Sequence, residues 1–143
     1  MKLSYAGNVS VQTCWEKLRK EASAQLVDVR TRVEWNFVGV PVLESLEKQV
    51  IFSEWQRFPD MRVNEEFCDQ VIAHLARNNA DYDSSIFMIC RSGVRSMASA
   101  DALTARGYKY VFNVLGGFEG DTDENGHRAT KEGWKFEQLP WRQ

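Results

Sequence analysis

Short, nearly continuous apolar runs separated by longer amphipathic segments constrain the fold of this chain more than any other sequence feature. Four runs have the length of strands: residues 25–29 (QLVDV), 49–52 (QVIF), 85–90 (SIFMIC) and 110–114 (YVFNV). Strands without polar alternation are buried on both sides, as in a parallel sheet sandwiched between helices. We therefore predict an α/β fold with a mainly parallel, roughly five-stranded sheet and helices on both faces.

The segments between these runs carry helix signals. They predict three helices and a short helical turn: residues 10–20, the turn after Thr31, a helix from Asn64, and residues 93–106. Ser10 and Thr31 are preferred N-cap types, and Gly107 is well placed to end the last helix. Ligands of such sheets bind beyond the carboxyl ends of the strands, so the loops that follow the strands are expected to line one rim.

The size and composition of the chain suit one globular domain. The 143 residues are enough for a proper hydrophobic core, and the 9 glycines and 3 prolines form no linker-like stretch. We expect a single domain over residues 1–143, with its motif-bearing core at about 10–120 and a tail, 121–143, packing on it. The formal net charge of −2 gives no reason to expect a nucleic acid or an anionic membrane as partner.

The apolar segments and the cysteines indicate where in the cell the protein works and the state of its thiols. No apolar run approaches the roughly 18–20 residues of a membrane span, and the amino terminus lacks a secretion signal, so we expect a cytoplasmic protein. Cys14, Cys68 and Cys90 are odd in number and widely spaced, which predicts free thiols rather than disulfides or a zinc site. We expect neither a metal nor a cofactor.

A glycine-containing, cationic loop follows the most apolar predicted strand. It begins with Cys90 and continues with Arg91, Ser92, Gly93, Val94, Arg95 and Ser96. Backbone N–H groups of a turn that enters a helix form an anion-binding nest, and the two arginines add full positive charges. Such surroundings stabilise a thiolate, whereas a buried cysteine without them is usually a small apolar residue. Cys90 is thus the candidate nucleophile, and the loop is the candidate substrate-binding site.

Three motifs in this chain resemble those of the rhodanese family. The loop from Cys90 to Arg95 is similar to the family's active-site motif C-R-x-G-x-R. Residues 26–30 (LVDVR), with Glu34 four residues on, resemble the strand motif L-[IV]-D-V-R, and residues 113–117 (NVLGG) resemble N-[VL]-x-G-G. The motifs occur in the family's order across most of the chain.

This resemblance implies a compact α/β domain that transfers sulfur in two steps. Cys90 takes a sulfane sulfur from a donor such as thiosulfate, and the resulting persulfide passes it to cyanide, a thiol or a protein acceptor. Loop residues 91–96 would hold the donor and the persulfide. By the same comparison, Asp28, Arg30 and Glu34 support the loop rather than perform chemistry.

The spacing of the loop bears on two alternative functions. Cysteine-dependent phosphatases place one more residue between cysteine and arginine, and Ser96 stands where their arginine would be. The shorter loop favours a sulfur adduct over a tetrahedral phosphate. A phosphatase or arsenate reductase, and a regulatory docking module without turnover, remain the alternatives.

The chain departs from the family pattern in one region. Many members carry H-x-P-G-A after the first motif, whereas this chain has residues 37–42 (FVGVPV). The loop at residues 53–61 is long and aromatic, and it is predicted to lie on the functional rim. We hypothesise that Trp55 and Phe58 form one wall of the substrate entrance; the alternative is that both rings cover the sheet edge.

Overall fold

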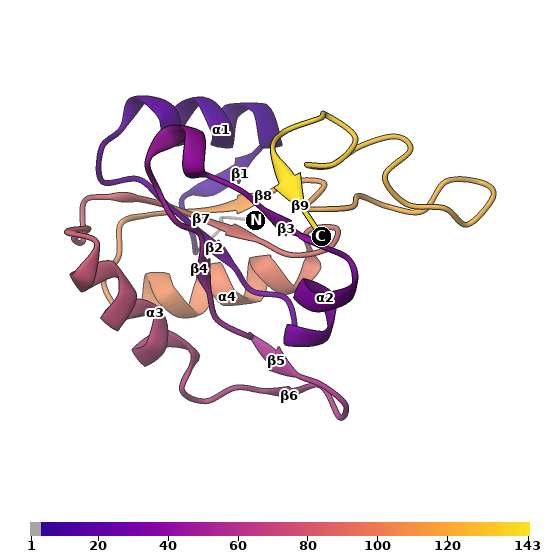
Figure 1. Ribbon diagram of the computed structural model, residues 1–143. Helices are drawn as coiled ribbons and strands as arrows, with labels where there is room; N and C mark the ends of the chain where they lie inside the picture. Colours follow the sequence, from indigo (N-terminus) through magenta and orange to yellow (C-terminus); the bar gives the residue numbers. More distant parts are fainter. Residues whose placement is uncertain (1–3) are drawn as a thin grey trace.

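A parallel five-stranded sheet forms the centre of the computed structural model, which describes residues 4–143 (Figure 1). The strand order is β1-β8-β7-β2-β4, and every neighbouring pair is parallel. The strands are β1 (Gly7–Val9), β2 (Gln25–Asp28), β4 (Ile51–Phe52), β7 (Ser85–Ile89) and β8 (Tyr110–Val114). The predicted α/β class and parallel sheet are confirmed.

Helices cover both faces of the sheet, as predicted. Helix α1 (Val11–Lys20) lies on one face, and α3 (Phe67–Arg77) and α4 (Val94–Ala105) lie on the other (Figure 1). The short helix α2 (Arg32–Phe37) and the 3-10 turn η1 (Glu44–Leu46) lie in the connections between β2 and β4. The Ser10 side chain caps α1 by accepting a hydrogen bond from the N–H of Thr13.

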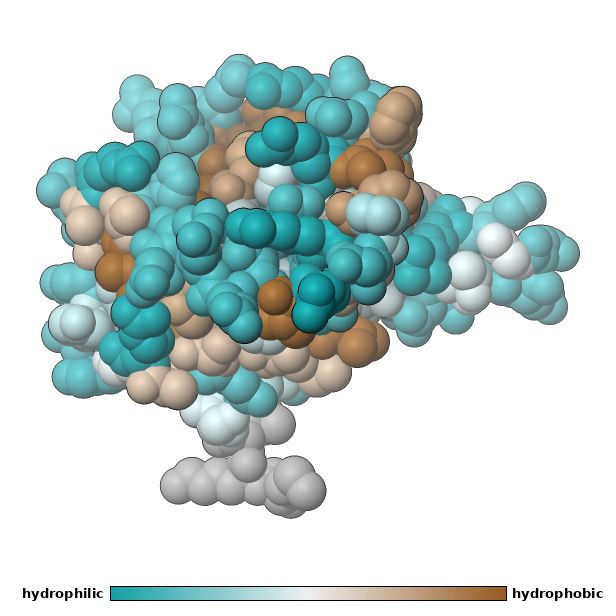
Figure 2. All heavy atoms as spheres, turned by 90° about the horizontal axis from the view of Figure 1, so that it is seen from below, coloured by the Kyte–Doolittle hydropathy of each residue, from teal (hydrophilic) through white to brown (hydrophobic). Residues whose placement is uncertain are grey.

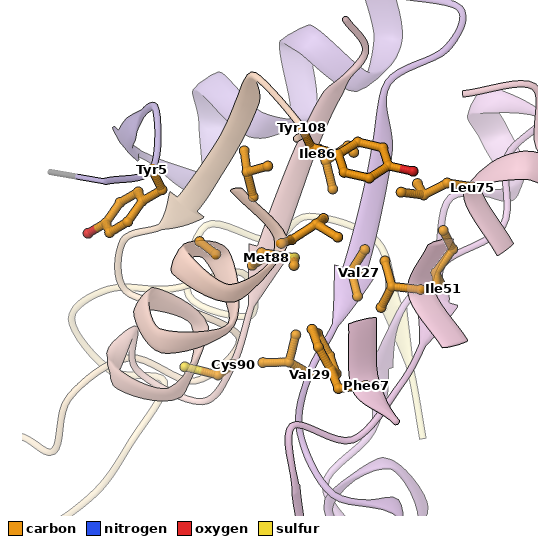
Figure 3. Packing of buried hydrophobic residues seen from close by; sticks show 14 residues of the cluster. Tyr5, Val27, Val29, Ile51, Phe67, Leu75, Ile86, Met88, Cys90 and Tyr108 are labelled. Atoms are coloured by element: carbon orange, nitrogen blue, oxygen red, sulfur yellow. The ribbon is translucent and has the colours of Figure 1, made fainter. Parts of the chain in front are cut away.

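Alternate residues of the central strands form two apolar layers, which explains why the runs show no polar alternation. On one face, Leu26, Phe87 and Ile89 pack with Leu18 of α1. The layer on the other face, drawn in Figure 3, includes Val27, Ile86, Met88, Val71 and Leu75. All five residues of β7 are buried, so this strand anchors whatever follows it.

The structure differs from the sequence prediction at several element boundaries. Helix α3 begins at Phe67 rather than Asn64, because the Asn64 side chain instead donates to the carbonyl of Glu54 and accepts from the N–H of Glu66. The edge strand β1 was not predicted, since three residues carry too short a pattern. Two small antiparallel pairs were also missed: β3 (Val40–Pro41) with β9 (Trp141–Arg142), and β5 (Gln56–Arg57) with β6 (Arg62–Val63).

The carboxyl-terminal segment is anchored by aromatic side chains. Trp134 is fully buried in the apolar layer beneath α1, and its Nε1 donates to the carbonyl of Pro140 at 2.7 Å. The ammonium of Lys135 lies 4.1 Å from the ring centre of Trp141 and donates to the Val38 carbonyl. Between Gly120 and these anchors, the chain forms a loop that reaches away from the body (Figure 1).

Within residues 4–143, no helix combines the length and the apolar character needed to cross a bilayer.

Replacing the buried ring of Trp134 tests whether the tail contributes to the core. We expect Trp134→Ala to lower the free energy of unfolding by about 3–5 kcal/mol, because it removes a large, fully buried side chain. Phe136→Ala is the matched control, since the Phe136 ring is 42% exposed, and it should cost less than about 1 kcal/mol. Urea unfolding measures both, and equal losses would contradict this account of the tail.

Candidate active site

The Cys90 thiol lies at the carboxyl end of β7, just before α4. The cysteine is only 1% exposed, and Figure 3 shows it next to Val29 and a helix. Its sulfur accepts hydrogen bonds from the backbone N–H groups of Gly93, at 3.1 Å, and Ser96, at 3.4 Å. The Ser96 hydroxyl oxygen lies 3.1 Å from the same sulfur. The turn therefore directs two backbone N–H donors at Sγ, an arrangement suited to a negatively charged sulfur.

The carbonyl groups of the same turn point away from the sulfur, towards residues 118–120. The carbonyl of Cys90 accepts from the N–H of Phe118 at 2.8 Å, and that of Arg91 accepts from Glu119 and Gly120, both at 3.0 Å. Gly117 makes this approach possible, because a Cβ atom there would lie 2.5 Å from the Cys90 oxygen. Backbone pairing with residues 118–120 thus keeps the N–H groups facing inwards.

Arg95 is held in place by Glu34 of α2. Two hydrogen bonds of 2.6 and 2.8 Å join the guanidinium and the carboxylate, and Glu34 also completes a capping box with Thr31. Burial raises the pKa of Glu34, but the hydrogen bonds and charge of Arg95 outweigh it and leave the pKa below its usual range. Burial lowers the pKa of Arg95, and the bonds to Glu34 reverse this and raise it.

Asp28 and Arg30 form a second ion pair, which is completely buried. Nε and Nη2 of Arg30 donate to the Asp28 carboxylate at 3.0 and 2.7 Å, and Nη2 also donates to the carbonyl of Gly39. The guanidinium lies 4.2 Å from the ring centre of Phe118. The pair therefore supports the loop indirectly, by packing against Phe118. Neither side chain hydrogen-bonds to Cys90.

An open pocket of about 420 Å³ lies beside the cysteine. Its lining comprises Glu34, Met61, Cys90, Arg91, Ser92, Val94 and Arg95. Val94 is 69% exposed, whereas Gly93 and Ser96 lie beneath the sulfur rather than in the pocket wall. The structure thus brings all the predicted loop residues together with Glu34 around one sulfur atom.

The aromatic residues predicted at the entrance do not line this pocket. The Trp55 ring packs edge-on against Phe67, with ring centres 5.2 Å apart, because its backbone N–H is tied to Val29 at the sheet edge. Phe58 is exposed and lines a neighbouring hollow of about 710 Å³. Met61, between β5 and β6, takes the predicted place. Sequence spacing could not distinguish these three residues of one loop.

The surface near the β5–β6 hairpin is chemically mixed. Figure 2, which views the molecule from the side of this hairpin, shows a mainly hydrophilic face with an apolar area among the hydrophilic residues.

The other two cysteines lie away from this pocket. Cys14 is completely buried, and burial raises the pKa of its thiol. Burial also raises the pKa of the half-buried Cys68. All three cysteines are free, and among residues 4–143 no group of three or more His, Cys, Asp or Glu side chains is arranged to hold a metal ion.

Asn113 is a polar contact of the site that the motif did not explain. It lies in β8 next to the buried Val114 and is 1% exposed, and its Oδ1 accepts a hydrogen bond from the Ser96 hydroxyl. A polar residue inside an apolar strand was the available sequence signal.

Gly117→Ala tests the backbone contact that orients the loop. The new Cβ would lie 2.5 Å from the Cys90 oxygen, at a positive φ of 61°. We expect a loss of unfolding free energy at least about 2 kcal/mol larger than that of Gly126→Ala. Gly126 has a similar φ of 78°, but a Cβ atom there would meet no other atom within 4 Å, so this control isolates the contact from the dihedral strain. Equal losses of unfolding free energy for the two variants, measured in urea, would show that the close contact at Gly117 does not matter.

Glu34→Gln tests the ion pair through its pH dependence. The folded-state pKa of Glu34 is depressed, so its stabilisation is complete above the unfolded value, 4.5, and is lost as pH falls through the folded value. We expect wild type to exceed the variant in unfolding free energy by about 1–3 kcal/mol at neutral pH. Urea unfolding at pH 7 and at about pH 2.5 should show this difference shrinking. A constant difference would mean that the carboxylate charge is not responsible.

Comparison with known proteins places the chain in a family. The model of the STR4 middle domain matches residues 6–143. The crystal structure of Rv0390 from M. tuberculosis is 40% identical, with a TM-score of 0.86 over 97% of this chain and 98% of that one. The uncharacterised protein RC0915 of Rickettsia conorii is 37% identical over 94% of this chain and 95% of its own length.

A plant enzyme is also similar. Thiosulfate sulfurtransferase 18 of Arabidopsis thaliana is 34% identical over 111 residues, which are 77% of this chain and 75% of that protein. The match to the STR4 middle domain spans the motifs around Asp28, Cys90 and Asn113. The chain therefore belongs to the rhodanese-like domain family, and within it to the members described by the STR4 middle domain.

Proposed function

We propose that this protein is a sulfurtransferase that moves a sulfane sulfur from a donor such as thiosulfate to a thiophilic acceptor through a persulfide on Cys90. The observation that carries the proposal is the pair of backbone N–H groups that donate to Sγ, at 3.1 and 3.4 Å. The similarity to a protein named thiosulfate sulfurtransferase supports the same chemistry.

In the first step, the Cys90 thiolate attacks the outer sulfur of thiosulfate. An S–S bond forms at Cys90 while the sulfur–sulfur bond of thiosulfate breaks, and sulfite leaves with its bonding electron pair. The persulfide then carries a single negative charge on its outer sulfur. Because this charge stays next to the nest of N–H groups, the loop stabilises the product of the step as well as the nucleophile.

In the second step, an acceptor attacks the outer sulfur. Cyanide leaves as thiocyanate, and a small thiol or a protein thiol becomes a persulfide, while Cys90 returns as a thiolate. Arg91 is exposed at the pocket and is suited to guiding an anionic donor. Arg95 also lines the pocket, and its ion pair with Glu34 fixes the position of its positive charge there.

Intact-protein mass spectrometry after incubation with thiosulfate tests the proposal. We expect wild type to gain the mass of one sulfur atom, and cyanide to remove it with release of thiocyanate. Cys90→Ser should show no gain, whereas Cys68→Ser, which changes a half-buried thiol outside the pocket, should behave as wild type.

Two results would argue against sulfur transfer at Cys90. One is a sulfur adduct that persists in Cys90→Ser, and the other is the absence of any adduct with thiosulfate and with a second donor such as mercaptopyruvate. Hydrolysis of a generic phosphate ester by the same cysteine would then favour the phosphatase alternative.

A further inference from the structure

The Ser96 hydroxyl lies between two acceptors but has one proton. Its oxygen is 3.1 Å from Sγ of Cys90 and 2.5 Å from Oδ1 of Asn113, to which it donates. The Asn113 amide is oriented from its other side, because its Nδ2 donates to Oδ1 of Asn8 at 3.0 Å. Tyr5 donates to the same Asn8 oxygen. The Ser96 proton therefore points away from the cysteine.

We propose that Asn113 is a positioning residue that holds the Ser96 hydroxyl proton away from Cys90, and so favours the sulfur-loaded cysteine over the free thiolate. This inference rests on the proposed sulfur transfer and adds a residue that acts through Ser96 without touching the reacting atoms.

The thiol and the thiolate place opposite demands on Ser96. A Cys90 thiol donates its proton to the Ser96 oxygen, which is compatible with the bond to Asn113. A thiolate gains most if the hydroxyl turns and donates to it. This rotation of the hydroxyl would leave Oδ1 of Asn113 without its donor. Because Asn113 is only 1% exposed, its unpaired acceptor would be unfavourable. Asn113 therefore withholds one hydrogen bond from the thiolate.

The persulfide makes no such demand. Its inner sulfur is bonded to Cβ and to the outer sulfur, and the negative charge lies mainly on the outer atom, nearer the pocket. Ser96 can then keep its bond to Asn113. The arrangement fits the loaded state and leaves the free thiolate more reactive towards a donor.

The charged groups around Cys90 act equally on every variant used in the test. Arg91 and Arg95 face the pocket from the loop and α4, and Glu34 faces it from α2. The buried Asp28–Arg30 pair lies behind the loop. None of these groups is replaced, so a shift between variants reports the Ser96 hydroxyl.

The pH dependence of Cys90 alkylation by iodoacetamide, measured in the Cys14→Ala, Cys68→Ser background, tests the inference. Asn113→Leu removes the acceptor and frees Ser96 to donate to the thiolate, so the half-maximal pH should fall by about one unit. Adding Ser96→Ala to Asn113→Leu removes the hydroxyl that the first substitution frees, so the half-maximal pH should return towards the wild-type value. This reversal distinguishes positioning through Ser96 from a general loosening of the site, which the second substitution would not reverse.

Tyr5→Phe is the matched control, since it removes a hydroxyl that donates to Asn8 and leaves the Asn8–Asn113 and Ser96–Asn113 contacts in place. It should keep the wild-type profile even if it lowers stability. If Asn113→Leu does not fold, Asn113→Ala removes the same acceptor with a smaller side chain. An unchanged or raised half-maximal pH in a folded Asn113 variant overturns the inference.

A second readout uses the persulfide fraction by mass spectrometry at fixed thiosulfate and sulfite. Asn113→Leu should lower the loading equilibrium constant about tenfold relative to wild type. If wild type accepts no sulfur, the proposed function fails. The alkylation profile still shows whether Asn113 keeps the Ser96 hydroxyl from donating to the thiolate. If wild type loads and Asn113→Leu matches it in both readouts, the inference alone fails.

Discussion

The backbone contact between the turn after β7 and residues 118–120 is the constraint on which the rest of the site depends. A turn this short has its N–H groups on one side only if its carbonyl groups are satisfied on the other. Phe118, Glu119 and Gly120 supply those partners. The nest around Sγ is thus a property of two segments, one after each of the neighbouring strands β7 and β8, which the sheet holds in register.

The charged side chains behind the loop support this backbone contact indirectly, through the ring of Phe118. Arg30, neutralised by Asp28, lies against the Phe118 ring at 4.2 Å from its centre, and Lys135 lies 5.2 Å from the centre of the same ring. Lys135 also contacts Trp141, which extends the stack into the carboxyl-terminal segment. A buried ion pair by itself is weak support for stability. Here its placement fixes the position of an aromatic ring next to the residues that orient the loop.

Much of the fold and part of the site could be predicted from the sequence. The apolar runs identified four of the five strands, and the CRSGVRS turn identified the residues around the sulfur. The strand β1 could not be predicted because its three residues depend on β8 for pairing. The place of Met61 in the pocket could not be predicted either, since it depends on how the β5–β6 hairpin packs. Local patterns encode burial and turns, whereas long-range packing decides which member of a loop meets the ligand.

The glycines at the base of the outlying loop have a consequence for how this chain can vary. A Cβ atom on Gly120 would collide with the backbone oxygen of Glu132, and one on Gly133 would lie 2.9 Å from the Gly120 nitrogen, so the two ends of the loop meet backbone to backbone. The loop between Gly120 and Gly133 therefore starts and ends at the same place on the body of the domain. Insertions and deletions within residues 121–127 should therefore leave the nucleophile in place, whereas Arg128 and Ala129 are still bonded to the carbonyls of Gly120 and Glu119.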